Sequence, residues 1–108
     1  MGPLKGIKVI DLTRVLAGPF CTMMLADMGA EVIKIERPGS GDDSRAFGPH
    51  QKGESAYFMS INRGKKSLTL DLKADRGKDV LKRLIKNADV LVENFKPGVM
   101  KKLGLGYE

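Results

Sequence analysis

The chain of 108 residues is long enough for one domain and too short for two. Its hydrophobic content of 42% and charged content of 30% are those of a globular protein and exclude a disordered one. The chain has no apolar run near the roughly 20 residues that cross a bilayer and no signal-peptide pattern. The single cysteine excludes an internal disulfide framework, and we expect a cytoplasmic protein.

The net charge of +6, from 19 basic and 13 acidic residues, favours an anionic partner. Nucleic acid is a weak candidate, because the charges form no block and the chain has only four Phe and two Tyr to stack on bases. A small phosphorylated ligand explains the same charge, and so does simple solubility.

The first half of the chain predicts a β-α-β unit. Residues 7–13 ("IKVIDLT") and 31–36 ("EVIKIE") are short, mostly apolar runs that are typical of strands buried on both faces. Between them, Gly18-Pro19 opens a helix that Gly29 ends. Short connections of this kind predict parallel strands with a right-handed crossover.

The middle of the chain is less regular. Residues 37–55 predict a long loop, in which "GSGDDS" (39–44) is interpreted as a turn rather than a phosphate cradle, and Asp42 and Asp43 as solvated carboxylates. Residues 56–62 fit either a helical turn or a short strand. In "SLTLDL" (67–72), alternating leucines predict a half-buried strand.

The last third predicts an amphipathic helix over residues 74–88, a fourth strand over 89–95 and a short helix over 97–104. The whole pattern predicts an α/β fold with an open, mainly parallel sheet. Because the chain stops directly after a crossover helix, we expect it to be the N-terminal piece of a longer protein.

Positively charged residues follow every predicted strand. Ligands of open parallel sheets bind beyond the carboxyl ends of the strands. The residues at those ends are Arg14, Arg37, Lys73, and the group Asn94, Phe95 and Lys96. The sequence therefore predicts an electropositive crevice for a ligand with several phosphates. The alternative is that these side chains simply face water.

The sequence offers no dinucleotide fingerprint and no convincing catalytic group. The first strand-to-helix turn reads "RVLAGP" in place of G-x-G-x-x-G, and Arg37 directly after Glu36 favours a phosphate near an adenosine ribose. Cys21 is interpreted as a packing residue, and His50 has no recognisable nucleophile partner. No Cys or His spacing indicates a metal site.

Three ordered segments resemble family III CoA-transferases, the CaiB/BaiF group that includes formyl-CoA transferase and α-methylacyl-CoA racemase. They are "PLKGIKVIDLTRVLAGPFCTMMLADMGAEVIKIERPGSGDDSR", "NRGKKSLTLDLK" and "ADVLVENFKPGVMKKLGLGYE". The resemblance covers nearly all of the chain and about the first quarter of a family member. It implies that residues 1–108 are a Rossmann-like domain with helices on both faces, and that the whole protein is an intertwined homodimer.

The resemblance also implies a CoA site, with coenzyme A or acyl-CoA as a substrate and no tightly bound cofactor. The residues that it assigns to this site are Val15, Leu16, Ala17, Arg37, Leu70, Asp71, Leu72, Lys73, Asn94, Phe95, Lys96 and Lys102. Arg37 would lie against the adenine or its 3′-phosphate, and Lys73 would point toward phosphate. Lys102 stands where many members have arginine, so a bidentate phosphate contact would become a single charge.

The family's nucleophile is an aspartate whose motif matches none of the aspartates here, so it is expected beyond Glu108. The chain should then contain no catalytic residue and be inactive alone. Arg14 stands where formyl-CoA transferase has histidine, and arginine there is more common in members acting on dicarboxylic acyl groups. A racemase or epimerase of the same family, a non-catalytic CoA- or nucleotide-binding module and a nucleic-acid binder remain as alternatives.

Overall fold

The computed structural model describes residues 2–105, so residues 106–108 of the third resembling segment lie outside the described part. Within it, four parallel strands form one sheet in the order β5-β2-β1-β6. The strands are β1 (Lys8–Asp11), β2 (Glu31–Glu36), β5 (Lys66–Thr69) and β6 (Val90–Val92). This is the order in which the first four strands of a Rossmann fold are arranged, which confirms the predicted fold class.

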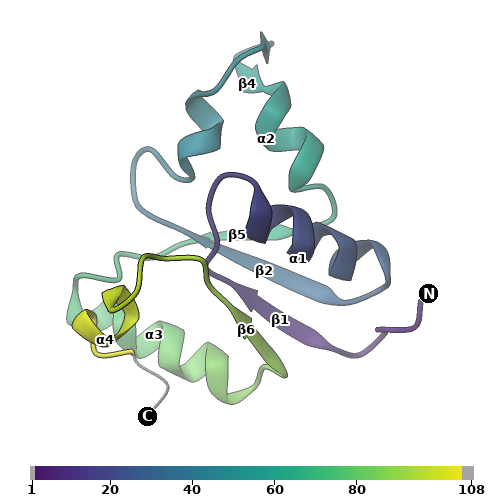
Figure 1. Ribbon diagram of the computed structural model, residues 1–108. Helices are drawn as coiled ribbons and strands as arrows, with labels where there is room; N and C mark the ends of the chain where they lie inside the picture. Colours follow the sequence, from purple (N-terminus) through teal and green to yellow (C-terminus); the bar gives the residue numbers. More distant parts are fainter. Residues whose placement is uncertain (1, 106–108) are drawn as a thin grey trace.

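The helices cover both faces of this sheet (Figure 1). Helix α1 (Ala17–Asp27) lies on one face beside α2 (Ala56–Ile61), and α3 (Asp75–Lys86) lies on the other face with α4 (Val99–Lys102). The chain runs outward from β1 to β5 and then returns across the sheet to β6, so right-handed crossovers place the later helices on the opposite face. None of the helices in residues 2–105 is long and apolar enough to cross a lipid bilayer.

Two hydrophobic clusters hold the layers together. One lies between the sheet and α1 and is formed by Val9, Ala30 and Val32, with Leu25 and Ala26 against it. The other lies between the sheet and α3 and is formed by Ile10, Leu12, Ile35 and Leu81, with Leu84 and Ile85 against it. Neighbouring residues of β1 therefore point to opposite cores, as the nearly continuous apolar run predicts.

The segment predicted as a long loop contains short regular elements. A 3-10 helix, η1 (Asp43–Ala46), is followed by an antiparallel hairpin of β3 (His50–Gln51) and β4 (Glu54–Ser55). Residues 56–62, which the sequence left open, begin as helix α2 because the Ser55 hydroxyl accepts a hydrogen bond from the Phe58 amide at 3.1 Å. Together these elements project beyond the sheet (Figure 1).

Helix α1 has the predicted ends but not the predicted burial. Gly29 follows it with a φ of +104°, a backbone conformation that glycine adopts without strain. Cys21 is exposed, so its prediction as a packing residue is wrong. The helix is apolar around most of its circumference, but it contacts the sheet along one side only, which leaves Phe20 45% and Met24 44% exposed.

The first turn of α3 lies directly against the loop that follows β5. A Cβ atom added to Gly77 would lie 2.0 Å from the main-chain oxygen of Asp71, closer than any van der Waals contact allows. Gly77 has an ordinary helical φ, so its conformation does not require glycine. The close approach of the two backbones does. The contact sets the position of residues 71–73 at the carboxyl edge of the sheet.

We expect Gly77→Ala to lower the free energy of unfolding by about 1–3 kcal/mol, although alanine favours helices more than glycine does. The new methyl group must push α3 away from the loop after β5. Chemical denaturation measures the effect, and Asp79→Ala, an exposed change in the same helix, is the control. A Gly77→Ala protein as stable as the control would contradict the close approach.

Candidate functional site

A cleft of about 590 Å³ opens at the carboxyl edge of the sheet. The ends of β1, β2, β5 and β6 all contribute to it, together with α4. Its lining residues are Leu12, Thr13, Arg14, Ile35, Glu36, Arg37, Pro38, Gly41, Asp42, Leu70, Asp71, Leu72, Lys73, Phe95, Val99 and Leu103. The cleft therefore lies where ligands of doubly wound sheets bind.

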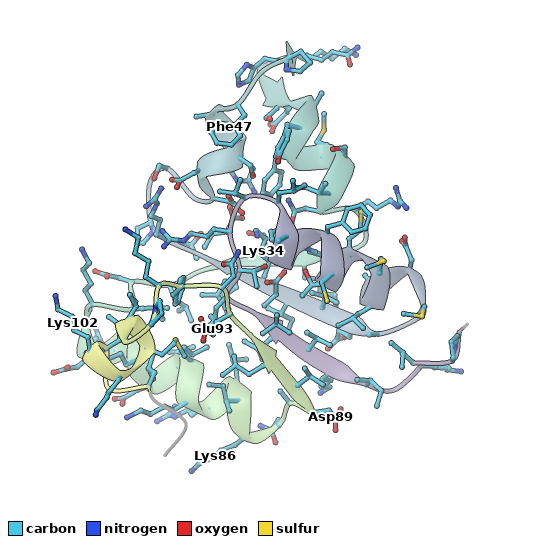
Figure 2. The ribbon with its side chains drawn as sticks, in the orientation of Figure 1. Lys34, Phe47, Lys86, Asp89, Glu93 and Lys102 are labelled. Atoms are coloured by element: carbon cyan, nitrogen blue, oxygen red, sulfur yellow. The ribbon has the colours of Figure 1, made fainter. Side chains whose placement is uncertain are left out.

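The cleft brings together part of the residue set expected from the sequence. Arg37, Leu70, Asp71, Leu72, Lys73 and Phe95 line it, and so does Arg14. The other expected residues do not line it: they are Val15, Leu16, Ala17, Asn94, Lys96 and Lys102. Figure 2 shows Lys102 on the outer side of α4. Of the cations expected at the strand ends, Arg14, Arg37 and Lys73 line one cleft, whereas Lys96, which follows β6, does not.

The cations of the cleft differ in how far they are already engaged. The Arg37 Nε donates hydrogen bonds to the Gly41 carbonyl at 2.9 Å and to the Ser40 hydroxyl at 3.1 Å, and its guanidinium forms an ion pair with Asp43. The Lys73 ammonium has no hydrogen-bond or ion-pair partner among residues 2–105. A phosphate could therefore pair with Lys73 directly, whereas at Arg37 it would compete with Asp43.

Asn94 holds the main chain of Arg14 just beyond the ends of the paired strands β1 and β6. The Arg14 amide donates to Asn94 Oδ1 at 3.0 Å, and Asn94 Nδ2 donates to the Arg14 carbonyl at 2.9 Å. The Arg14 guanidinium lies over the Phe95 ring, 5.0 Å from its centroid, in a cation–π contact. The side-chain amide of Asn94 is thus committed to the protein backbone, and Arg14 and Phe95 form one wall of the cleft.

A family model for CoA-transferase family III matches residues 4–108. The chain belongs to this family. It is 56% identical over 109 residues to the succinyl-CoA:glutarate CoA-transferase of Mus musculus and 52% identical over 107 residues to the acetyl-CoA:oxalate CoA-transferase of Acetobacter aceti. These matches cover 100% and 99% of this chain but 25% and 28% of the relatives, so the chain spans about a quarter of their length.

A solved structure of a CaiB/BaiF family protein from Brucella suis has the same arrangement. It superposes with a TM-score of 0.91 at 47% sequence identity, over 98% of this chain and 29% of that one. The family III fold thus includes the sheet and helices described here, and the resemblance found in the sequence is confirmed.

Glu36, the last residue of β2, is committed to a network of hydrogen bonds. Its carboxylate accepts hydrogen bonds from Arg45 at 2.7 and 2.8 Å, from the Asp42 amide at 2.9 Å and from the Ser67 hydroxyl. Burial alone raises the pKa of Glu36, but these hydrogen bonds outweigh it and lower the pKa to about 2. The carboxylate therefore stays ionised and joins β2, β5 and η1.

Two buried ion pairs, one of which includes the lining residue Asp42, were missed by the sequence interpretation. Lys34 Nζ lies 2.8 Å from Asp42, and Lys65 Nζ lies 3.0 Å from Asp11, with every side chain at most 2% exposed. Figure 2 shows Lys34 reaching from β2 toward the first strand-to-helix turn. The prediction of a solvated Asp42 is wrong, although that of Asp43 holds. A lysine inside the apolar run "EVIKIE" was the signal for such a pair, since lysine is almost never buried unpaired.

The Lys34–Asp42 pair also holds the first strand-to-helix turn. Lys34 Nζ donates to the Thr13 carbonyl at 2.9 Å, and the Val15 amide donates to the Asp42 carboxylate at 3.1 and 3.3 Å. Burial raises the pKa of Asp42, but the hydrogen bonds from Lys34 and from main-chain amides lower it by more. The pKa therefore lies below its ordinary value and the carboxylate is ionised. Val15 has a φ of +72°, which costs a β-branched residue about 1–3 kcal/mol.

We expect acid to weaken this network by protonating Glu36. Because the pKa of Glu36 is about 2 in the folded chain and 4.5 without the fold, its ionised form stabilises the protein above pH 4.5. That contribution, about 3 kcal/mol, is lost as the pH falls from 4.5 toward 2. Denaturant unfolding at several pH values measures it in the unchanged protein and in Glu36→Gln.

The Glu36→Gln protein should be less stable at neutral pH and should lose less stability in acid. Asp42 also titrates in this direction, but it does so in both proteins, so the difference between them isolates Glu36. Parallel pH profiles for the two proteins would mean that Glu36 has no lowered pKa.

Proposed function

We propose that the cleft binds coenzyme A, in a protein that transfers CoA between carboxylic acids. The observation that carries the proposal is the convergence of Arg14, Arg37 and Lys73, from the ends of three separate strands, on one cleft. Membership of CoA-transferase family III supports CoA as the ligand. A cluster of cations is what the phosphates of a CoA nucleotide require.

We place the 3′-phospho-ADP part of CoA between Arg37 and Lys73. Lys73 offers an ammonium without a partner among residues 2–105, and the Arg37 side chain is 46% exposed. Leu70 and Leu72, which precede Lys73 in the same segment, also line the cleft and provide an apolar surface suited to an adenine ring. In this arrangement both charged and apolar parts of the nucleotide have partners.

The remaining expected residues fit this site in different ways. We propose that Asn94 acts through Arg14, because its side-chain amide already bonds the Arg14 main chain. Leu16, which is 49% exposed at the start of α1, is accessible to the apolar arm of CoA. We assign Lys96 and Lys102 a weaker, longer-range electrostatic role, because neither lines the cleft.

We further propose that the reaction is transfer to or from a dicarboxylic acid. The curated relatives compared above are CoA-transferases that are named for glutarate and oxalate, which favours transfer over racemisation. Arg14, which we also take to be one of the cations that bind CoA, would pair with the second carboxylate when the acyl group carries one.

The carboxylates in the cleft lining are all engaged: Glu36 pairs with Arg45, Asp42 pairs with Lys34, and Asp71 accepts the Lys73 amide. We therefore propose that the nucleophile comes from another part of the whole protein, which we take to be a cytoplasmic homodimer.

Arg37→Ala should weaken the binding of CoA about tenfold, because one charge-assisted phosphate contact is lost. The same change should alter the affinity for 3′-dephospho-CoA much less, because that ligand lacks the phosphate that Arg37 contacts. Isothermal calorimetry with both ligands, and with NAD as a poorly fitting nucleotide, measures the difference.

Arg63→Ala is the matched control for this experiment. Arg63 also pairs with an aspartate, Asp27, at 2.8 Å, but it does not line the cleft. If Arg37→Ala lowers the affinities for CoA and dephospho-CoA equally, Arg37 does not contact the 3′-phosphate. Equal binding of CoA and NAD by the unchanged protein would overturn the CoA proposal itself.

A further inference from the structure

Val15 is held in a backbone conformation that its side chain disfavours. Its φ is +72°, in the left-handed region where a β-branched residue is a genuine outlier. Such a conformation persists only when the surrounding structure enforces it, and it is found most often at functional sites. Val15 directly follows Arg14, which lines the cleft, so the cause of this conformation bears on the site.

The enforcing groups are the two side chains of a buried ion pair. The Asp42 carboxylate accepts the Val15 amide hydrogen, and the Lys34 ammonium donates to the Thr13 carbonyl. The two charges lie 2.8 Å apart and both side chains are at most 1% exposed. The pair therefore bridges the main chain on both sides of Arg14 and cannot rearrange without exposing or separating two buried charges.

The arrangement replaces the glycines that usually make this turn. In a glycine-rich turn, the chain adopts left-handed conformations without strain and remains free to leave them. Here a strained conformation is held by charged side chains, so the turn is set before any ligand arrives. Its direct consequence is the position of Arg14, whose guanidinium lies over the Phe95 ring at the cleft wall.

We propose that Lys34 and Asp42 are positioning residues for the cleft: by holding Val15 in the left-handed conformation, they keep Arg14 in place for the ligand. The proposal rests on the proposed function, because it takes CoA to be the ligand whose binding depends on Arg14. A pair that served stability alone could be replaced by uncharged side chains with no effect on binding.

The test asks whether removal of the ion pair affects CoA binding through the main-chain conformation of Val15. The combined change Lys34→Met with Asp42→Ser removes both charges, while serine still caps η1 by accepting the Ser44 amide. Serine is too short to reach Val15. The change is made in the unaltered protein and in a Val15→Gly background, both at native length, and CoA affinity is measured by calorimetry with folding checked by circular dichroism.

In the unaltered background we expect CoA affinity to fall about tenfold, because Val15 leaves its strained conformation. In the Val15→Gly background the same change should cost less than about threefold, because glycine adopts that conformation without strain when the ligand binds, even without the pair. Val15 amide hydrogen exchange should also accelerate when the pair is removed. Replacing the exposed pair, Arg63→Met with Asp27→Leu, should leave CoA affinity unchanged.

Equal losses in the two backgrounds, or no loss in either, would overturn the proposal. If that combined change does not fold, Lys34→Met with Asp42→Asn, which also removes both charges but keeps the shape of the acceptor, should give a smaller loss that Val15→Gly again reverses. CoA binding by the unaltered protein with unchanged binding by the variants would overturn this inference alone. Absence of CoA binding by the unaltered protein would overturn the proposed function and this inference with it.

Discussion

The buried charge pairs at the carboxyl edge of the sheet are the constraint on which the rest of the molecule depends. Lys34 with Asp42 and Lys65 with Asp11 lie 2.8 and 3.0 Å apart, almost completely shielded from water. Removing one partner of such a pair leaves an uncompensated buried charge and typically costs about 3–5 kcal/mol. Together the pairs join β1, β2, the segment before η1 and the segment before β5 into one unit.

This constraint explains how a turn without a glycine fingerprint keeps its conformation beside the cleft. The main-chain groups from Thr13 to Val15 are bonded by the side chains of Asp11, Lys34, Asn94 and Asp42. These side chains come from three different strands or their ends, so the turn is defined by the sheet as a whole. The chain therefore keeps aliphatic residues at this position, and we propose that cations elsewhere in the cleft hold the phosphates of CoA.

The strands and helices could largely be predicted, because their signals are local. Apolar runs and an amphipathic repeat are properties of neighbouring residues, and β2 has the predicted bounds. The burial of α1 could not be predicted in this way. A helix that is apolar all round gives no indication of which side meets the sheet, and Cys21 lies on the exposed side. The same limit applies to residues 56–62, where the Ser55 hydroxyl caps the N-terminus of a helix.

The sequence by itself determined the order of strands and helices and the presence of a cation after each strand, because parallel strands bring their carboxyl ends to one edge. Only the tertiary structure decided which of these cations share the cleft and which carboxylates are buried. Asp42 and Asp43 are neighbours in sequence, yet one is 2% exposed and paired with Lys34 while the other faces water. The difference arises because burial of a charge depends on where the fold places its partner: Lys34 lies inside the sheet, whereas Arg37, the partner of Asp43, is itself exposed.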